Sequence, residues 1–444
     1  MKQLRTLIIL VIVFGGLLGY LYFVDAKRPV GDVEEKPEVF DVDADAIQAL
    51  RIRSRSGETT ELTKTDGTWR ITSPIEAPAD ASTVGSITSN LAALSIQRVV
   101  DENPTDLGRY GLAEPTLEVA FRTKADEPYK VLQLGDKTAA GADMYAKRGG
   151  ENQVFLVYNY IESSFDHGTF DLRDKRILTF DRDKVDRIEV RHGGSTIVLT
   201  KQDGEWRLAE PIQVRADYSA AEGLLSRLAS LQMREIVDEN VQERDFAKFG
   251  LRNPSTQVTL SSGSSQAALV VGSKTGDDLV HVRDLSRPAV FTTGSDILTE
   301  LQKTAADYRR KDVFEFRTYN VDRLEIARGS ETLVFERQRG KGKDGADAWR
   351  NVTADREVDA AKFESFLSRL TALRAGSFVD KPAGASPDVV VKTTFDDGKR
   401  NEEVRITRAG GQVHAVRGDE PGAAVVEASE LDEVLKQLDE LVKA

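Results

Sequence analysis

The sequence contains no cysteine and no concentrated patch of charge. The absence of Cys from all 444 residues excludes disulfides, thiolate metal sites and cysteine nucleophiles. The formal net charge is −12, and the acidic and basic residues are interleaved along the chain. Because nucleic-acid binding needs clustered Lys and Arg to neutralise phosphates, no nucleic-acid partner is expected.

Motifs that carry catalysis or metal binding are also missing. Neither a G-x-S-x-G nucleophile elbow nor an H-E-x-x-H zinc pattern occurs. Gly272-Ser273-Lys274-Thr275 lacks the spaced upstream glycine of a phosphate-binding loop, and we interpret it as a β-turn. We therefore predict no catalytic, cofactor-binding or metal site, and we expect that the protein is not an enzyme.

One acidic pattern resembles a calcium loop. Asp41, Asp43 and Asp45 alternate, but the EF-hand loop needs Gly at its sixth position and Glu at its twelfth. Ala46 and Ile52 occupy those two positions. The pattern is therefore interpreted as the solvated entry to a strand.

The longest apolar run lies near the N-terminus. Residues 6–24 form an uncharged run of 19 residues, which as a helix would span roughly 28 Å, close to the ~30 Å hydrocarbon core of a bilayer. Lys2 and Arg5 precede the run, and no A-x-A-like cleavage site follows it, which favours an uncleaved anchor over a signal peptide. Residues 25–38 read as a polar linker. The sequence thus predicts a single-pass protein of the bacterial inner membrane, with the bulk of the chain in the periplasm.

An internal repeat dominates the rest of the chain. Residues 63–103 and 200–240 align without a gap at a constant offset of 137 residues, and 19 of the 41 aligned positions are identical. A more divergent third copy follows, in which residues 321–326 match residues 185–190. Duplication of one module explains this pattern.

The repeat divides the chain into three modules. The sequence predicts them at residues 39–179, 180–315 and 316–444. The third copy is degenerate, because it lacks the Gly-Leu signature of the other two. In its place the third copy has Gly-Ala-Ser-Pro at residues 384–387. Terminal repeats are commonly atypical because they cap an array, so a capping role is expected for the third module.

Each module begins with strands and then a helix. An Asp-Gly pair between alternating apolar runs predicts a type I′ hairpin, and the tryptophan that follows is expected to pack on the sheet. An Asp at the helix start can cap free N–H groups, and apolar residues at 3-4-3 spacing form one buried stripe. These repeated positions are Asp66-Gly67, Asp203-Gly204 and Asp344-Gly345; Trp69, Trp206 and Trp349; Asp80, Asp217 and Asp359; and the stripes that start at Val84, Ala221 and Phe363.

The second half of each module is rich in short strands. In the first copy these are predicted at residues 117–121, 130–134, 144–147 and 154–157. Meanders of this kind with one helix on a face make an α+β module with a mostly antiparallel sheet. The fold class predicted for the whole chain is three such tandem modules after one N-terminal transmembrane helix.

Two polar features recur between copies. Val-Asp-Glu-Asn occurs at residues 100–103 and 237–240, and we interpret it as a turn after a strand, with a partner-binding surface as the alternative. His281 and His414 occupy a place where the first copy has Tyr145, which indicates a packing position rather than a metal ligand.

The combination of these motifs resembles a bacterial family. Trp-Arg-Ile at residue 69, Tyr-Gly-Leu-x-x-Pro at residue 110, Leu-Gly at residue 134 and Leu-Arg-Asp at residue 172 resemble the family known as domain of unknown function 4340. The resemblance covers nearly the whole chain after the anchor. It implies an anchored envelope protein, often associated with ABC-type export systems similar to those linked to gliding motility, and it implies no catalytic residues.

The expected function follows from the anchor, the repeat and this resemblance. We expect a non-enzymatic, membrane-anchored periplasmic scaffold or accessory subunit of an ABC-type envelope transport complex. Its partners would be the inner membrane, through residues 6–24, and the permease and ATPase components of the transporter. The alternative is a binding module for an envelope lipid or glycan.

Overall fold

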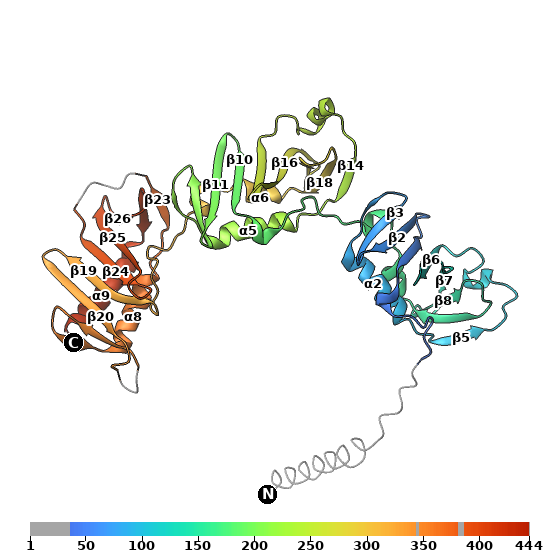
Figure 1. The fold of residues 1–444 in the computed structure, drawn as a ribbon, viewed down its shortest axis with the longest axis horizontal. Helices are drawn as coiled ribbons and strands as arrows, with labels where there is room; N and C mark the ends of the chain where they lie inside the picture. The colour runs from blue at the N-terminus through green and yellow to red at the C-terminus, as the bar shows by residue number, and fades with distance from the viewer. Residues whose placement is uncertain (1–35, 343–345, 381–385, 444) are drawn as a thin grey trace, which may run out of the picture. The chain divides into compact units, whose positions relative to one another are not determined.

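The structure is a computed structural model that describes residues 36–342, 346–380 and 386–443 (Figure 1). The chain divides into two compact units between Lys175 and Arg176. Three predicted features lie outside the described residues: the anchor at residues 6–24, most of the linker, and the third Asp-Gly turn. Within the described ranges, no helix is long and apolar enough to cross a membrane.

The first unit is built on a nine-stranded antiparallel sheet, here called the first sheet. Its strand order is β4-β3-β2-β1-β6-β7-β8-β9-β5, so the fifth strand in sequence pairs with the last one. The strands are β1 (Ala49–Arg53), β2 (Thr59–Thr65), β3 (Thr68–Ser73), β4 (Ala77–Pro78), β5 (Arg98–Asp101), β6 (Leu117–Arg122), β7 (Lys130–Lys137), β8 (Asp143–Arg148) and β9 (Val154–Tyr158).

The second unit contains two further sheets with the same strand order. The second sheet comprises β10 (Arg187–His192), β11 (Ser195–Gln202), β12 (Glu205–Glu210), β13 (Val214–Arg215), β14 (Glu235–Asp238), β15 (Thr256–Ser262), β16 (Ser265–Thr275), β17 (Leu279–Asp284) and β18 (Val290–Gly294). The third sheet comprises β19 (Val321–Arg328), β20 (Glu331–Gln338), β21 (Ala348–Asn351), β22 (Arg356–Val358), β23 (Ser377–Val379), β24 (Val389–Phe395), β25 (Arg400–Ala409), β26 (Gln412–Arg417) and β27 (Ala423–Val426). Three antiparallel sheets with packed helices confirm the predicted α+β class and the repeated modules.

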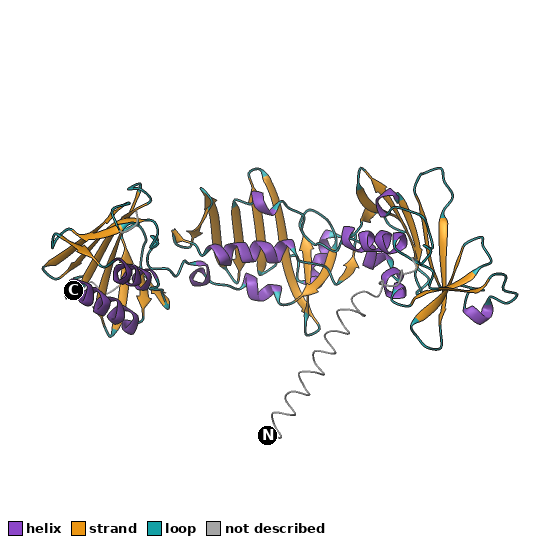
Figure 2. Ribbon diagram, turned by 90° about the horizontal axis from the view of Figure 1, so that it is seen from below, coloured by secondary structure: helices purple, strands orange, loops and turns teal. Residues whose placement is uncertain are grey.

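A helix of 12 residues covers a face of each sheet, and in the third sheet α9 (Ala428–Lys443) packs beside it, as Figure 2 shows in purple. The helices are α2 (Ala81–Ala92), α5 (Tyr218–Ala229) and α8 (Ala360–Thr371). Each helix connects the fourth strand of its sheet to the fifth, and these strands lie at opposite edges, so the helix has to cross the sheet. Asp80, Asp217 and Asp359 each accept a hydrogen bond from an N–H of the first turn, which confirms the predicted caps. The predicted stripes are buried against the sheets.

The Asp-Gly hairpins form as predicted in the first two sheets. Asp66 and Gly67 have φ of 49° and 78°, and Asp203 and Gly204 have φ of 52° and 83°. Positive φ at both central residues is the type I′ geometry, which matches the right-handed twist of the flanking strands. The repeated Trp follows each turn and is buried; in the second sheet Trp206 is 1% exposed.

A second turn explains the Tyr-Gly-Leu and Leu-Gly motifs. The 3₁₀ turn η3 (Gly108–Tyr110) ends at Gly111 with φ of 69° and packs on β7, where a Cβ on Gly135 would lie 2.1 Å from the Tyr110 oxygen. In the second sheet η5 (Glu243–Phe249) repeats this contact on Gly272, with 2.1 Å to the Phe249 oxygen. Only glycine permits so close an approach of two backbones. The β-turn prediction for residues 272–275 is wrong, because they continue β16 past a register shift.

The modules end differently. Short helices close the first two, whereas the third ends in the 16-residue α9 (Ala428–Lys443), which buries four apolar side chains at helical spacing. The short helices and 3₁₀ turns are α3 (Ile161–Phe165), α4 (Thr169–Leu172), α6 (Ile297–Leu301), α7 (Ala305–Tyr308), η2 (Ala44–Ala46) and η4 (Arg182–Lys184). The capping role of the third module stays a prediction.

Candidate functional site: a buried charge cluster in the second unit

The residues singled out in the sequence have structural roles. Asp101 Oδ1 accepts a hydrogen bond from the Asn103 N–H at 3.1 Å, and Asp238 does the same for Asn240 at 2.8 Å. These bonds confirm a turn after a strand. Asp101 also accepts from the Tyr110 hydroxyl at 3.2 Å, which ties this turn to the Tyr-Gly-Leu motif.

The aromatic-or-His position is a packing position, as predicted. The Tyr145 ring lies 5.0 Å from the Tyr110 ring, and His281 lies 5.1 Å from Phe249 at the matching place in the second sheet. His414 is 7% exposed on β26.

One of the three alternating acids near the first sheet, Asp43, caps a 3₁₀ turn. Asp43 accepts a hydrogen bond from the Asp45 N–H at 2.8 Å and begins η2. The described ranges contain no group of three His, Cys, Asp or Glu side chains placed to hold a metal ion.

A cluster that was not predicted lies where the second and third sheets meet within the second unit. Its first part consists of two arginines around one glutamate. Arg215, at the end of β13, donates to Glu420 Oε1 from Nε at 2.6 Å and from its backbone N–H at 3.1 Å. Arg309, just after α7, lies 3.5 Å from Glu420 Oε2 and donates to the Pro421 oxygen at 3.1 Å. The three charged side chains are only 8%, 7% and 5% exposed.

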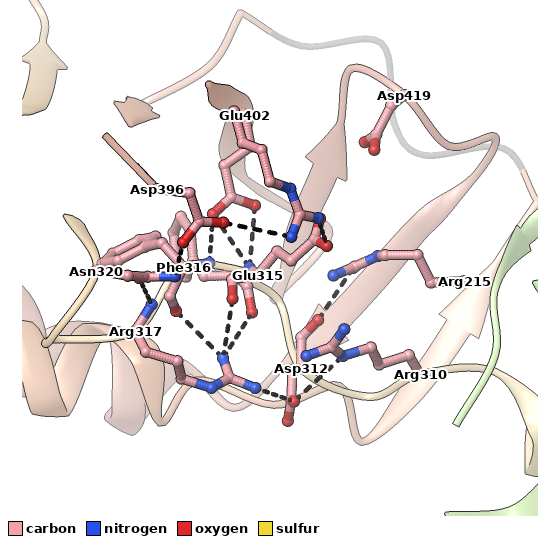
Figure 3. Close-up of polar contacts among 12 residues, drawn as sticks. Arg215, Arg310, Asp312, Glu315, Phe316, Arg317, Asn320, Asp396, Glu402 and Asp419 are labelled. Atoms are coloured by element: carbon pink, nitrogen blue, oxygen red, sulfur yellow. Dashed lines mark hydrogen bonds and ion pairs between the residues drawn. The ribbon is translucent and has the colours of Figure 1, made fainter. Parts of the chain in front are cut away.

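The second part of the cluster lies within the third module. Arg417 forms an ion pair with Glu402, whose side chain is 2% exposed, and lies 3.0 Å from Asp419. Glu402 also accepts from the backbone N–H groups of Glu315 and Phe316, each at 3.0 Å, as Figure 3 shows. The segment that enters the third module is thereby fixed to its sheet. We call Arg215, Arg309, Glu402, Arg417 and Glu420 the junction cluster.

Further polar contacts surround the junction cluster (Figure 3). The Asp312 carboxylate lies 2.9 Å from Arg317 and 3.4 Å from Arg310, and its backbone oxygen accepts from Arg215 at 3.1 Å. The Arg309 guanidinium also lies 4.1 Å from the centre of the Phe378 ring. These contacts spread the buried charge over several partners.

Burial and pairing move the pKa values in the cluster. Burial lowers the pKa of Arg215, and the Glu420 carboxylate opposes this shift without cancelling it. Burial likewise lowers the pKa of Arg309 against the same carboxylate. For Arg417, burial also acts to lower the pKa, but the bonds to Asp419 and Glu402 outweigh it, and the pKa is raised.

The arrangement can hold two modules together but leaves little room for a ligand. The space left between Arg215, Arg309, Phe378 and Glu420 is about 10 Å³, which is at the lower limit for a single water. Arg215 Nη1 and Arg309 Nε are buried with no hydrogen-bond partner among the described residues. The site is therefore a structural junction whose specificity lies in the placement of its charges.

A comparison of the copies explains why this junction is specific. Glu420 precedes Pro421, and the matching position before Pro288 in the second module is Arg287, a residue of the opposite charge. Arg287 donates to the Arg176 oxygen at 3.2 Å. An alignment anchored on the two prolines would have revealed this charge reversal, but it could not have shown which residues face it.

The fold and this junction define the class of protein: a tandem array of α+β modules in which the second and third modules are joined by buried ion pairs. The chain belongs to the family described as "Domain of unknown function (DUF4340)", whose model matches residues 69–207 and 206–394, more than half of the chain.

Two further comparisons give no functional information. No curated protein matches the chain. Among solved structures, a DNA polymerase sliding clamp from Pseudomonas aeruginosa with ligand is similar at 8% identity, over 87% of this chain and 92% of that chain, with a TM-score of 0.16. A likeness at that score supports no argument about fold or function.

Proposed function

We propose that the chain is a non-enzymatic scaffold or accessory subunit of an ABC-type envelope transport complex. In this proposal residues 6–24 anchor the chain in the bacterial inner membrane, and the three modules work in the periplasm. The permease and ATPase of the transporter are the proposed partners. The observation that carries the proposal is the junction cluster, which joins two modules into one compact unit.

The energetics of the junction cluster favour a role in fixing how two modules are arranged. Burying an ion pair is costly, and well-packed apolar residues are often as stabilising or more so. What buried charges add is a preference for one partner surface, because a wrong partner leaves a charge unpaired. A scaffold needs this property, since its modules must present their surfaces in a fixed relation.

The sheet faces opposite the long helices suit polar partners. Along β1 the core residues alternate with Arg51, which pairs with Glu61 of the neighbouring strand at 2.8 Å. In the third sheet Glu403 pairs with Lys392 at 3.6 Å and with Arg405 at 2.7 Å. Such solvated ion pairs add little stability, but they set the charge pattern that a partner meets.

Affinity purification of the full chain from native membranes tests the proposal. Recovery of a permease and an ATPase at amounts comparable to the chain is the expected result. Recovery of the chain alone, under conditions that keep a known membrane complex of the same cells intact, would contradict it.

The alternative, a binding module for an envelope lipid or glycan, also stays a prediction. Mass spectrometry of the extracted protein tests it directly. A bound lipid or glycan species present in every preparation would favour it over the scaffold proposal.

A further inference from the structure

The first module exposes two stacked tyrosines, here called the tyrosine pair. Tyr158, the last residue of β9, and Tyr160, just before α3, are 46% and 56% exposed. Their ring centroids lie 6.0 Å apart, with 27° between the ring planes. Aromatic rings carry a large apolar area, so two rings left in water form a candidate contact surface.

The tyrosine pair lies where the chain enters the module. The Lys36 ammonium lies 5.2 Å from the centre of the Tyr158 ring and donates to its hydroxyl at 3.4 Å. It also donates to Gln97 Oε1. Lys36 is the first residue that the structure describes, so the chain that precedes it joins the module beside the tyrosine pair.

The other two modules carry no aromatic residue at these positions. Strands β9, β18 and β27 align through the residue that lies opposite the Tyr-or-His position on the neighbouring strand. The aligned positions are Tyr158, Gly294 and Glu427 for the first ring, and Tyr160, Asp296 and Ser429 for the second.

An ion pair occupies this corner in the other modules. Arg227 of α5 pairs with Asp296 in the second module, and Arg369 of α8 lies 3.5 Å from Glu430 in the third. Both arginines follow the Asp that caps their helix by ten residues, and the uncharged Asn90 has that place in the first module. The first module thus differs from the other two in having exposed rings where they have a solvated ion pair.

The neighbour at the entrance also differs between the modules. The chain enters through a matching backbone bond, made by the N–H of Val39 in the first module and of Val313 in the third. Three residues before Val313, the Arg310 N–H donates to the Arg215 oxygen of the second module at 3.0 Å. The entrance of the third module therefore meets the module that precedes it, whereas the linker and the predicted anchor precede the entrance of the first.

We propose that the tyrosine pair rests on the periplasmic surface of the bilayer that holds the predicted anchor. The inference rests on the anchor in the proposed function and adds a second membrane contact, made by the first module. Residues 25–35 join the anchor to Lys36, and eleven residues reach at most about 40 Å even when fully extended. The entrance of the first module is therefore confined near the bilayer.

Tyrosine suits such a surface because its ring is apolar while its hydroxyl stays hydrated, and it is enriched at the interface between lipid and water. The linker also raises the effective concentration of the pair at the bilayer. A contact too weak to bind vesicles from solution can thus hold the first module in place.

The absence of cysteine from the chain allows a single-site fluorescence test. The full chain is reconstituted into vesicles of phosphatidylethanolamine and phosphatidylglycerol, with a fluorophore on Ser163→Cys. Ser163 is an exposed residue of α3 whose hydroxyl donates to the Tyr160 oxygen at 2.9 Å. Thr299→Cys, at the matching exposed position of α6, carries the control label. Lipids with a nitroxide in the headgroup region quench a label that contacts the bilayer.

Three variants show whether the rings cause the quenching. Tyr158→Ser combined with Tyr160→Ser removes both rings, and the corresponding double substitution with Phe keeps them. Tyr218→Ser removes a tyrosine of the second module that is 53% exposed. The comparison between the two labels uses the native tyrosines, so it holds whether or not the double Ser variant folds.

The expected result is stronger quenching of the Ser163→Cys label than of the Thr299→Cys label. The double Ser variant should lose this difference, whereas the double Phe variant and Tyr218→Ser should keep it. Equal quenching of both labels overturns the inference, as does quenching that persists in a folded double Ser variant. Absence of quenching together with a cross-link from Ser163→Cys to a permease in cells would assign the pair to a protein partner and also overturn it.

Flotation of the vesicles separates this inference from the proposed function. A chain that does not float with the vesicles overturns the anchor and the inference together. A chain that floats without selective quenching overturns the inference alone, and affinity purification still tests the scaffold proposal.

Discussion

Replacing Glu420 with Gln should weaken the junction between the second and third sheets. The amide keeps the shape of the carboxylate but removes the one charge that faces both Arg215 and Arg309. These arginines are 8% and 7% exposed, so water cannot take over from the lost carboxylate. Removal of one partner from a buried ion pair costs about 3–5 kcal/mol.

A loss of about 3 kcal/mol raises the population of the open junction roughly a hundredfold. Hydrogen exchange followed by mass spectrometry can measure this change in the segment of residues 309–316, where the Arg310 N–H donates to the Arg215 oxygen at 3.0 Å. Exchange that is limited by local opening should accelerate by the same factor.

Glu403→Gln is the matched control. Glu403 also pairs with two cations, Lys392 and Arg405, but it is 30% exposed, and exposed pairs contribute about 0–1 kcal/mol. Exchange in residues 309–316 should not change in this variant. If Glu420→Gln accelerates exchange no more than Glu403→Gln does, the cluster does not hold the modules together.

Three further predictions concern the module itself. Gly272→Ala should lower the free energy of unfolding by about 3 kcal/mol, because the new Cβ would collide with the Phe249 backbone oxygen. Gly223→Ala should raise it by about 1 kcal/mol, because Gly223 lies in a helix with open space around it. Thermal unfolding of the two variants distinguishes these outcomes. Burial raises the pKa of Glu222, but its hydrogen bonds, led by the one from Trp206, lower the pKa by more than burial raises it. The pKa of Glu222 in the folded protein therefore lies below the ordinary value of 4.5. Its contribution to stability is therefore complete above about pH 4.5 and is lost as the pH falls through the lowered pKa, and Glu222→Gln should flatten the unfolding free energy over that range. Asp217→Ala should cost about 1 kcal/mol in urea denaturation because it removes the cap of α5, a hydrogen bond of 2.9 Å.

Local features of the module could be predicted because their signals are local. Two adjacent residues determine the type I′ turn at Asp66-Gly67, and one side chain determines the cap at Asp80. The buried stripe that starts at Val84 follows from helical periodicity alone. Repetition of these signals in three copies made each prediction stronger.

Features that depend on distant pairing could not be predicted. β5 pairs with β9 across more than fifty residues, and no pattern within either strand indicates its partner. The junction between Arg215 and Glu420 joins residues that are 205 positions apart. The pocket lined by Ser195 and Lys303 also depends on distant pairing, because these two residues lie more than a hundred positions apart in the sequence.

Cross-linking in intact cells shows whether this chain works as a scaffold bound to a transporter. The full chain at its native level is treated with a membrane-permeant cross-linker, and its adducts are identified by mass spectrometry. A scaffold of this kind is expected to form cross-links from lysines within residues 36–443 to the periplasmic loops of an ABC permease. Cross-links confined to the chain itself, in cells where other membrane complexes cross-link normally, would contradict it.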